Sequence, residues 1–274
     1  MKKYLLTILF AIILSINSAI AENIKFAQVT DVHLSKNNEY SKKVLESAVN
    51  DINNQDGISF VVFTGDNIDQ AKEDDLRVFF KIVNKLNVPY YVVIGNHDVY
   101  KYGGLSKAKF MEIMKREKML LYQRKPSYKF SKNGFDFYIV DGAKEMIPGA
   151  SGYFRKDTVS WIDKQLTKNS KKTSIIFQHF PLVLPPNSGS HRYKSHRTYK
   201  GEEYLAVLEK HDNVLAVVSG HLHTNNETMQ NGIYHISTSS LLTLPHTYKI
   251  IDIVTTKEFS PIIFTQLREI TVKN

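Results

Sequence analysis

The chain of 274 residues contains no cysteine. This absence excludes disulfide bonds and metal sites built from thiolates. The fold therefore has to be stabilised by its apolar core, and a chain of about 250 residues can bury a sizeable one as a single domain. Internal repeats and low-complexity linkers are also missing from the sequence, so no composition change divides it further.

Long apolar runs are scarce, and the one that stands out is at the N-terminus. Lys2 and Lys3 precede an apolar stretch over residues 4–16, which is shorter than the roughly 20 residues of a membrane-spanning helix. The Ala-Ile-Ala sequence at residues 19–21 has the pattern of a signal-peptide cleavage site. We expect residues 1–21 to be a signal peptide cleaved after Ala21, and residues 22–274 to be a periplasmic or secreted domain without a stable membrane span. A buried N-terminal helix and an uncleaved membrane anchor are the alternatives.

Acidic residues are fewer than basic ones, and the formal net charge is +9. Removing Lys2 and Lys3 with the signal peptide would leave +7. A positive surface raises the local concentration of anionic substrates. The basic residues are dispersed and no nucleic-acid-binding motif occurs, so a nucleic-acid partner is not expected.

Five short polar motifs, each placed just after an apolar run, are the most informative feature that is present. The runs are rich in Val, Ile or Phe, are typical of buried strands, and cover residues 24–29, 58–63, 90–94, 174–177 and 214–218. The motifs read Asp31-Val32-His33, Gly65-Asp66-Asn67, Gly95-Asn96-His97-Asp98, Gln178-His179-Phe180-Pro181 and Gly220-His221-Leu222-His223. Because open α/β folds bind ligands at the C-terminal ends of their strands, we expect one site at one edge of a sheet.

The residue types in these motifs indicate a metal centre. Imidazole, carboxylate and amide oxygen form a nitrogen and oxygen ligand set that suits Mn, Fe or Zn. Residues i and i+2 of a strand point to the same face, so Asp31 and His33 can bind one ion together, and His221 and His223 have the same spacing. Two ions roughly 3.5–4 Å apart can clamp the attacking and leaving oxygens of a displacement at phosphorus. Asp66 is the candidate for the carboxylate that bridges them.

Each motif alone has a simpler interpretation. Gly, Asn and Asp are common in turns, and a single histidine after an apolar strand is more often a satisfied core residue than a ligand. Here, however, each of the five motifs follows an apolar run and each contains a residue able to bind metal. This combination favours the dinuclear centre over five unrelated turns.

The five motifs resemble, in order, those of the calcineurin-like metallophosphoesterases: D-x-H, GD, GNH[DE], H and GHxH, over residues 31–223. The resemblance implies an α/β fold, a four-layer αββα sandwich with a dimetal site at the C-terminal ends of the strands. It also implies two divalent or trivalent ions with the following ligands. The first would be held by Asp31, His33, Asp66 and His223, and the second by Asp66, Asn96, His179 and His221.

The same resemblance implies the catalytic residues. His97 would lie beside the leaving group as a general acid or transition-state stabiliser, and Asp98 would orient its ring, since a carboxylate fixes the tautomer of an imidazole and raises its pKa. Two departures narrow the subclass. Asp69 stands where purple acid phosphatases carry a tyrosine ligand, and Gln70-Ala71 replaces the Arg-Gly of serine/threonine protein phosphatases. The remaining pattern is most similar to the bacterial cyclic-nucleotide phosphodiesterase-like branch.

The remainder of the chain fits an α/β order. Helical periodicity occurs in residues 41–53, 73–86, 107–118, 156–168 and 202–210, alternating with the apolar runs. Residues 128–131 and 135–140 flank Asn133-Gly134, a hairpin signal. After Gly220 we expect strands at 227–230, 233–237, 249–254 and 262–266, which together suggest another sheet packed on the first.

Two segments look like additions around the site: residues 142–155, and residues 185–200, which leave the metal site just after His179. The second is basic and aromatic. Arg192, Tyr193, Arg197 and Tyr199 are its candidates for binding the phosphate or base of a substrate, and a solvated loop is the alternative. Of the histidines outside the motifs, His211, His235 and His246 are expected to be structural, with His246 best placed to reach the site.

These observations predict an exported dimetal phosphohydrolase that cleaves a small phosphoester by attack of a metal-bridging hydroxide on phosphorus. Nucleotide-like substrates are favoured, and the choice between diester and monoester stays open. A non-catalytic binding or scaffold protein on a phosphoesterase fold is the alternative, although no ligand of the motifs is missing. The sequence makes no prediction of oligomeric state.

Overall fold

The computed structural model describes residues 23–118, 125–185, 195–255 and 261–272. The expected signal peptide, Arg192 and Tyr193 lie outside these ranges. Within them, none of the helices has the length and apolar character needed to cross a membrane.

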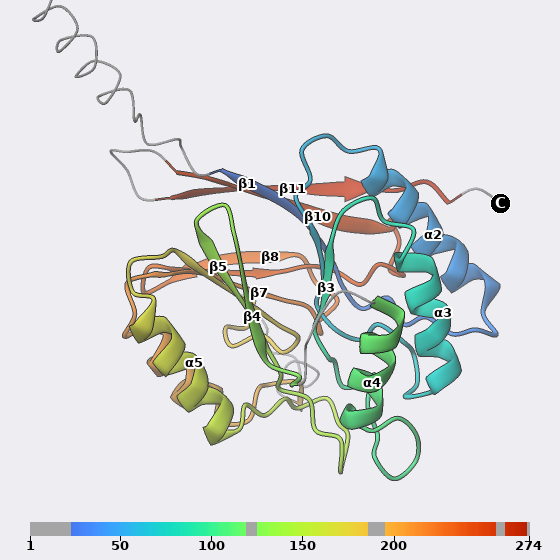
Figure 1. Ribbon diagram of the computed structural model, residues 1–274, viewed down its shortest axis with the longest axis horizontal. Coiled ribbons are helices and arrows are strands. Elements are labelled where there is room, and N and C mark those ends of the chain that lie inside the picture. Colours follow the sequence, from blue (N-terminus) through green and yellow to red (C-terminus); the bar gives the residue numbers. More distant parts are fainter. Residues whose placement is uncertain (1–22, 119–124, 186–194, 256–260, 273–274) are drawn as a thin grey trace, which may run out of the picture.

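The first of two sheets has five strands in the order β11-β10-β1-β2-β3 (Figure 1). Its centre is parallel, because β1 pairs with β2 and β2 with β3 in parallel register, whereas β10 and β11 are antiparallel additions. The strands are β1 (Ile24–Val29), β2 (Val61–Phe63), β3 (Tyr90–Val92), β10 (Thr247–Val254) and β11 (Ile262–Glu269). Three helices belong to this half: α2 (Glu39–Asn53), α3 (Glu73–Val83) and α4 (Lys107–Lys118).

The second sheet has six strands in the order β4-β5-β6-β7-β9-β8. Strands β5, β6, β7 and β9 are parallel, and β4 and β8 are antiparallel edges. The strands are β4 (Tyr128–Lys132), β5 (Phe135–Val140), β6 (Ser174–Gln178), β7 (Val214–Ser219), β8 (Asn226–Gln230) and β9 (Ile233–Ser237). The helices of this half are α5 (Lys156–Lys168) and α7 (Gly201–Leu208).

The two sheets pack face to face between two helical layers, with α2, α3 and α4 on one side and α5 on the other (Figure 1). The layer between the sheets is largely aromatic. Phe26 stacks on Phe60 with ring centroids 4.8 Å apart, and Phe137 stacks on Phe177 at 5.8 Å. A second buried cluster lies between helices and sheets. The expected four-layer αββα sandwich is therefore confirmed.

Helix α2 shows how local sequence produces these layers. The Asn38 side chain accepts a hydrogen bond from the Ser41 N–H, which satisfies one of the unpaired amides at the start of the helix. The buried residues recur at three- and four-residue spacing on one stripe, as an amphipathic helix requires. They are Ser41, Val44, Leu45, Ala48, Val49 and Ile52.

The arrangement of the strands corrects two expectations. The five motif strands do not share one sheet: β1, β2 and β3 belong to the first, and β6 and β7 to the second. The strands after Gly220 do not form a sheet of their own either, because β8 and β9 extend the second sheet and β10 and β11 extend the first. The apolar pattern identifies a buried strand but carries no information on which strand lies beside it.

A buried polar network joins the sheets beneath the motif loops. Gln28, at the end of β1, is fully buried. Its amide nitrogen donates to the Thr64 hydroxyl at 2.9 Å and to the Ser219 carbonyl at 2.8 Å, and its amide oxygen accepts from the Thr238 hydroxyl at 2.7 Å. Ser219 ends β7 of the opposite sheet. The network therefore fixes the two sheets relative to each other where the polar motifs emerge.

Candidate metal centre

Most of the expected metal ligands have an unusual backbone conformation. Asp31, His33, Asp66, His221 and His223 all have positive φ, between 42° and 72°. Such a conformation costs a residue other than glycine about 1–3 kcal/mol and persists where the surrounding structure enforces it. Because β1 ends at Val29 and β7 at Ser219, the ligand pairs lie in the loops beyond the strands. Their convergence thus comes from left-handed turns and not, as the sequence suggested, from the alternation of a strand.

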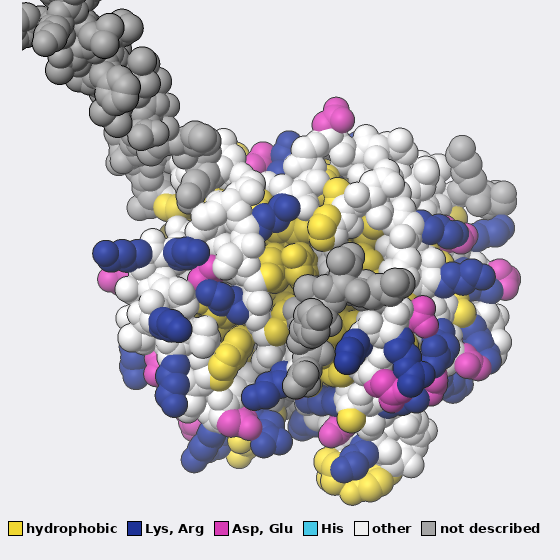
Figure 2. Space-filling view, viewed as in Figure 1, with side chains coloured by type: hydrophobic (Ala, Val, Ile, Leu, Met, Phe, Trp, Pro, Cys, Tyr) yellow, Lys and Arg dark blue, Asp and Glu magenta, His cyan; other side chains and the backbone are white. Residues whose placement is uncertain are grey.

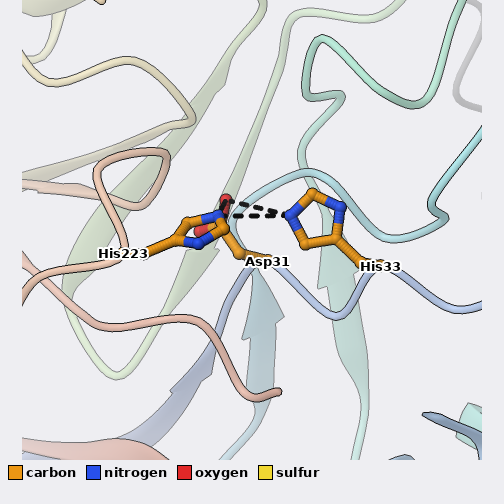
Figure 3. A group of neighbouring side chains, drawn as sticks. All are labelled: Asp31, His33 and His223. Atoms are coloured by element: carbon orange, nitrogen blue, oxygen red, sulfur yellow. Dashed lines mark hydrogen bonds and ion pairs between the residues drawn. The ribbon is translucent and has the colours of Figure 1, made fainter. Parts of the chain in front are cut away.

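The first ligand group contains Asp31, His33 and His223, whose side chains converge in Figure 3. The His223 Nε2 lies 3.2 Å from Asp31 Oδ1 and 3.2 Å from His33 Nε2. His33 Nε2 lies 4.0 Å from Asp31 Oδ1. These three atoms face one another, although the residues come from opposite sheets.

The second ligand group contains Asp66, His179 and His221, all buried. His179 Nε2 lies 3.2 Å from Asp66 Oδ2, from His221 Nδ1 and from Asn96 Oδ1. The four residues implied as ligands of the second ion therefore meet around one point.

Asp66 connects the two groups through a single oxygen. Its Oδ2 lies 3.2 Å from His179 Nε2 and 4.0 Å from His33 Nε2. Its other oxygen, Oδ1, accepts a hydrogen bond from the His97 backbone N–H at 2.8 Å. Because Oδ1 accepts this hydrogen bond, Oδ2 is the oxygen that faces both ligand groups. A carboxylate shared by two ions would need such an oxygen.

The donor set fits two metal ions. Two ligands at about 2.0–2.1 Å from a tetrahedral ion lie about 3.3 Å from each other, close to the 3.2 Å between the facing imidazole nitrogens in each group. Asp31 Oδ1 is buried and has no hydrogen bond of acceptable geometry among the described residues. A cation between these atoms would give Asp31 Oδ1 a partner. It would also bind the lone pairs of the imidazole nitrogens that face each other.

Hydrogen bonds behind the ligands orient them toward this point. Asp31 Oδ2 accepts from the Thr30 hydroxyl at 2.7 Å and from the His221 N–H at 2.9 Å, which leaves Oδ1 for the ion. The Nδ1–H of His179 donates to the Thr64 carbonyl at 2.8 Å, so that in the neutral ring the lone pair is on Nε2. Metal-binding carboxylates and histidines in proteins are held by such outer partners.

Two glycines allow ligands of different motifs to approach closely. A Cβ on Gly95 would lie 2.2 Å from the Asp66 backbone nitrogen and side-chain oxygen. A Cβ on Gly220 would lie 1.9 Å from the Thr30 hydroxyl and 2.5 Å from Asp31 Oδ2. The glycines of these motifs thus provide space for the carboxylates of neighbouring motifs.

The pKa values of His179 and His221 are shifted in opposite directions, upward by the Asp66 carboxylate and downward by burial. Burial acts to lower the pKa of His179, but the facing Asp66 carboxylate outweighs it and raises that pKa to about 9. Burial, together with the charge of His179, lowers the pKa of His221 to about 3. The lowered pKa favours the neutral form of His221 and the raised pKa favours the protonated form of His179, so an ion bound by His179 would have to displace that proton.

His97 lines the cavity over the centre, and its ring is oriented by a different group from the one that the resemblance implied. Together with His33 and Asp66 it forms a third set of side chains close enough to hold an ion. Its Nδ1–H donates to the Asp69 backbone carbonyl at 2.7 Å. That contact, and not one with Asp98, fixes the ring and leaves Nε2 for the reacting groups.

Asp98 instead holds the loops together, which corrects the orienting role expected for it. Its Oδ1 accepts from the backbone N–H groups of Asn67 and Ile68, and its Oδ2 from the Asn67 amide and the Gly95 N–H, at 2.7–3.1 Å. Burial, followed by the charge of Asp66, raises the pKa of this carboxyl to about 6. All four of its hydrogen bonds thus come from Asn67, Ile68 and Gly95, and the His97 ring bonds to the Asp69 carbonyl instead.

A cavity of about 870 Å³ opens over the centre. Besides residues of the metal groups, it is lined by residues of several other segments. The loops after β2 and β3 contribute Asp69, Lys72 and Tyr100, and the remaining lining includes residues 148–150 together with Ser240, Leu242 and Thr243. The segment 142–155 thus does reach the site.

The candidate substrate loop contributes to the cavity one residue that is not among its four candidate substrate-binding residues. Among residues 195–200, His196 lines the cavity. Arg197 is paired with Glu202 at 2.6 Å, and Tyr199 is 59% exposed. Neither lines the cavity, so their substrate-binding roles stay predictions. His196 follows the metal ligand His179 by many residues, and the sequence does not show that the loop folds back to the cavity. No local pattern therefore marks His196 as a cavity residue.

Two of the histidines outside the motifs, His211 and His246, have structural partners, whereas the Nε2 of the buried His235 has no hydrogen-bond partner among the described residues. His211 Nε2 pairs with Asp163 at 2.7 Å, joining α5 to the segment after α7. His246 is held by the Leu241 carbonyl at 2.8 Å and the Tyr40 hydroxyl at 2.7 Å, and it faces a separate, smaller cavity. His246 therefore does not reach the metal centre.

The sandwich and its paired ligand groups define the class of a dimetal phosphoesterase. The chain belongs to the family described as calcineurin-like phosphoesterase, which it matches over residues 24–225. It is a metal-dependent hydrolase of phosphoester bonds, and its family uses two divalent metal ions.

Individual relatives carry the comparison further. The chain is 30% identical over 224 residues to a probable glycerophosphodiester phosphodiesterase GpdQ of Arcobacter nitrofigilis, which covers 78% of this chain and 77% of that protein. It is 28% identical over 210 residues to a probable cyclic nucleotide phosphodiesterase of Coxiella burnetii, covering 74% and 77%. The crystal structure of a dimetal phosphatase from Danio rerio shares the fold, with a TM-score of 0.70 over 91% of this chain and 99% of that chain at 18% identity.

Proposed function

We propose that this protein is an exported phosphodiesterase that hydrolyses small phosphodiesters. The observation that carries the proposal is that Asp66 Oδ2 lies 3.2 Å from His179 Nε2 and 4.0 Å from His33 Nε2, so that this carboxylate could serve both ion sites of one centre. The names of the relatives from Arcobacter nitrofigilis and Coxiella burnetii both denote enzymes acting on phosphodiesters, which favours a diester over a monoester.

The ligands assigned to the centre are those of the two groups joined by Asp66. The first ion would be held by Asp31, His33, Asp66 and His223, and the second by Asp66, Asn96, His179 and His221. When bound, the two ions generate a nucleophile from water at neutral pH and offset the negative charge that develops on the phosphoryl oxygens.

His97 then acts on the leaving group. Its ring is fixed by the Asp69 carbonyl through Nδ1–H, so Nε2 is the atom that can exchange a proton at the cavity. A protonated Nε2 would donate to the leaving oxygen as its bond to phosphorus breaks. His97 is exposed to the cavity, which lets it reach substrate without losing its backbone contact.

Turnover of aryl phosphates by the mature protein tests this function. With added Mn²⁺ or Zn²⁺, bis(4-nitrophenyl) phosphate should be cleaved faster than 4-nitrophenyl phosphate, and a chelator should abolish both activities. Asp66→Asn, purified in parallel, controls for contaminating phosphatases. A faster reaction with the monoester would overturn the diester preference. No turnover with any metal would favour a non-catalytic binding or scaffold role.

Glycerophosphodiesters and cyclic nucleotides are the natural classes to compare next. The cavity of about 870 Å³ lies within the range of about 300–1,000 Å³ that is usual for small-ligand sites. Equal kcat/KM for the natural diesters and for bis(4-nitrophenyl) phosphate would contradict specific recognition of either class.

Export is proposed from the N-terminal sequence alone. The basic residues, the apolar stretch and the Ala-Ile-Ala pattern predict a mature chain that begins at Glu22. Mass spectrometry of the protein from periplasmic and cytosolic fractions tests this start. A variant with Ala19→Leu and Ala21→Leu should stay uncut. The intact Met1 form in the cytosol of wild-type cells would contradict export.

A further inference from the structure

His196 lies beside the metal ligands without being among the residues that the family motifs place there. Its ring centroid is 5.1 Å from that of His221, at an interplanar angle of 39°. It lines the same cavity as His97 and Asn96. His196 therefore adds an imidazole to the wall of the cavity next to the second ligand group.

The backbone around His196 is held by several hydrogen bonds to other segments. The Tyr199 N–H donates to the Gly152 carbonyl at 2.8 Å, and the Ser151 hydroxyl donates to the Arg197 carbonyl at 2.9 Å. The buried Thr198 hydroxyl donates to the Pro181 carbonyl at 2.8 Å. Residues 195–199 are thereby tied to the segment before α5 and to the loop after β6, and this support places the His196 side chain.

The neighbours of His196 are engaged elsewhere. The Arg197 guanidinium pairs with Glu202 at the start of α7, and the Tyr199 ring lies against Tyr153 with centroids 5.7 Å apart. Of the side chains at 195–200, only that of His196 lines the cavity. Within residues 195–200, His196 is therefore the side chain placed to contact a phosphoester bound in the cavity.

The local hydrogen bonding suits an imidazole that donates to an oxygen anion. The Ser195 hydroxyl lies 3.0 Å from His196 Nδ1. When that hydroxyl donates, Nδ1 is the acceptor and the hydrogen of the neutral ring is on Nε2. An Nε2–H group is the donor that a phosphoryl oxygen needs.

We propose that His196 is a substrate-binding residue that donates a hydrogen bond from its imidazole to a non-bridging oxygen of the phosphoryl group. The proposal rests on the phosphodiesterase function proposed above. Hydrogen bonds to charged groups are stronger than neutral ones, so loss of this donor should lower kcat/KM by about 10- to 100-fold.

The test compares His196→Ala with His196→Gln, which keeps an N–H donor. His211→Ala is the matched control, since it removes an imidazole that pairs with Asp163 and does not line the cavity. Turnover of bis(4-nitrophenyl) phosphate is measured with Mn²⁺, alongside metal content by elemental analysis and thermal unfolding. H196A should keep both ions and the unfolding temperature while kcat/KM falls, and H196Q should recover part of the loss.

Three outcomes would overturn the proposal. Wild-type kcat/KM in H196A would make His196 a bystander. Loss of an ion from H196A would make it a metal ligand instead of a substrate contact. An H196Q variant no better than H196A would exclude a role as hydrogen-bond donor. Wild-type turnover in the same assay separates all three from failure of the phosphodiesterase function itself.

Discussion

At the scale of single residues, the two oxygens of Asp66 have different partners. Oδ1 accepts from the His97 N–H, and Oδ2 faces both ligand groups. In Asp66→Asn, the amide can still bond to the loop but carries no charge to share between cations. We expect the variant to fold, to lose one or both ions, and to lose nearly all turnover. Elemental analysis and the diester assay measure this.

Asp69→Asn is the matched control for Asp66→Asn. The Asp69 carboxylate is 48% exposed and lies 3.8 Å from His33 Nδ1, so it lines the cavity without facing both groups. This variant should keep two equivalents of metal. Two full equivalents in Asp66→Asn would remove Asp66 from the bridging position.

His97 and Asp98 are adjacent, but the structure gives them separate tasks. His97→Ala removes a cavity side chain and should leave metal content and the free energy of unfolding unchanged. Activity should fall by about 10²–10⁴-fold for substrates with alkyl leaving groups. The loss should be smaller for 4-nitrophenyl esters, whose leaving group needs no proton. An equal loss for both would argue against an acid role.

Asp98→Ala should act on stability. It leaves the N–H groups of Asn67, Ile68 and Gly95 without their acceptor, and each unsatisfied buried donor costs about 1–3 kcal/mol. Urea unfolding should therefore show a loss of about 3 kcal/mol or more. A variant with wild-type stability and the leaving-group dependence of His97→Ala would restore the orienting role.

The proton between His179 and Asp66 links metal binding to pH. Asp66 raises the pKa of His179 to about 9, so below that pH a proton occupies Nε2 when no ion is bound. The ion must displace it, and affinity should therefore fall as pH is lowered and rise toward pH 9. Titration with Zn²⁺ in a weakly buffered solution with a pH indicator should show proton release. Affinity independent of pH between 6 and 9 would contradict this linkage.

Sequence reasoning at this scale found which residues converge but not how they are held. The motifs contain every side chain of the two ligand groups. A histidine or an aspartate that follows a buried strand can be recognised from the neighbouring residues alone. The partners of Asp98 are 3–31 positions away in sequence, and the Asp69 carbonyl that holds His97 is 28 positions away. Backbone groups from distant segments leave no local pattern, so the sequence does not indicate that the Asp69 carbonyl replaces Asp98, the residue for which the resemblance implies the orienting role.

At the scale of elements, strands and helices were predicted nearly to their ends, whereas sheet membership was not. Helices α4 and α5 begin and end at the expected residues, and α3 ends at Val83, three residues early. The apolar pattern within a helix or strand reflects the burial of that element itself, so it can be read from the element's own residues. Pairing depends on crossovers and on facing side chains of other elements, such as the Phe26 and Phe177 rings that meet between the sheets.

The Gln28 network gives a test of how the sheets are joined. Gln28→Leu keeps the volume but leaves the Thr64 and Thr238 hydroxyls and the Ser219 carbonyl without this partner. We expect a loss of about 1–3 kcal/mol in the free energy of unfolding and weaker metal binding, because ligands emerge on both sides of the network. Gln55→Leu, whose amide bonds only locally to Asp51, is the control. Unchanged metal affinity in Gln28→Leu would separate the network from the centre.

At the scale of the whole molecule, basic and acidic side chains alternate on the face drawn in Figure 2. Figure 2 shows Lys and Arg side chains interspersed with acidic ones over the drawn face, with hydrophobic side chains near its centre. Many of the described basic residues are in exposed ion pairs such as Lys85–Glu46 and Arg116–Glu112. On this face, the dispersal is compatible with a small anionic substrate, and the absence of a nucleic-acid partner stays a prediction from the sequence.

The division of the ligands between the sheets gives the ions a mechanical role. Asp31 and His33 follow β1 and His223 follows β7, so the first ion would be bound from both sheets, as the second would be through Asp66 and His221. Bound ions are then cross-links in a chain that has no cysteine to form any other. Metal at 100 times its Kd adds about 2.7 kcal/mol of stability per site, or about 5–10 °C in Tm. Differential scanning calorimetry with Mn²⁺ and with a chelator should show that shift, and Asp66→Asn should lose it. If the chain is exported as proposed, its lifetime outside the cytosol would depend on the free metal concentration around it.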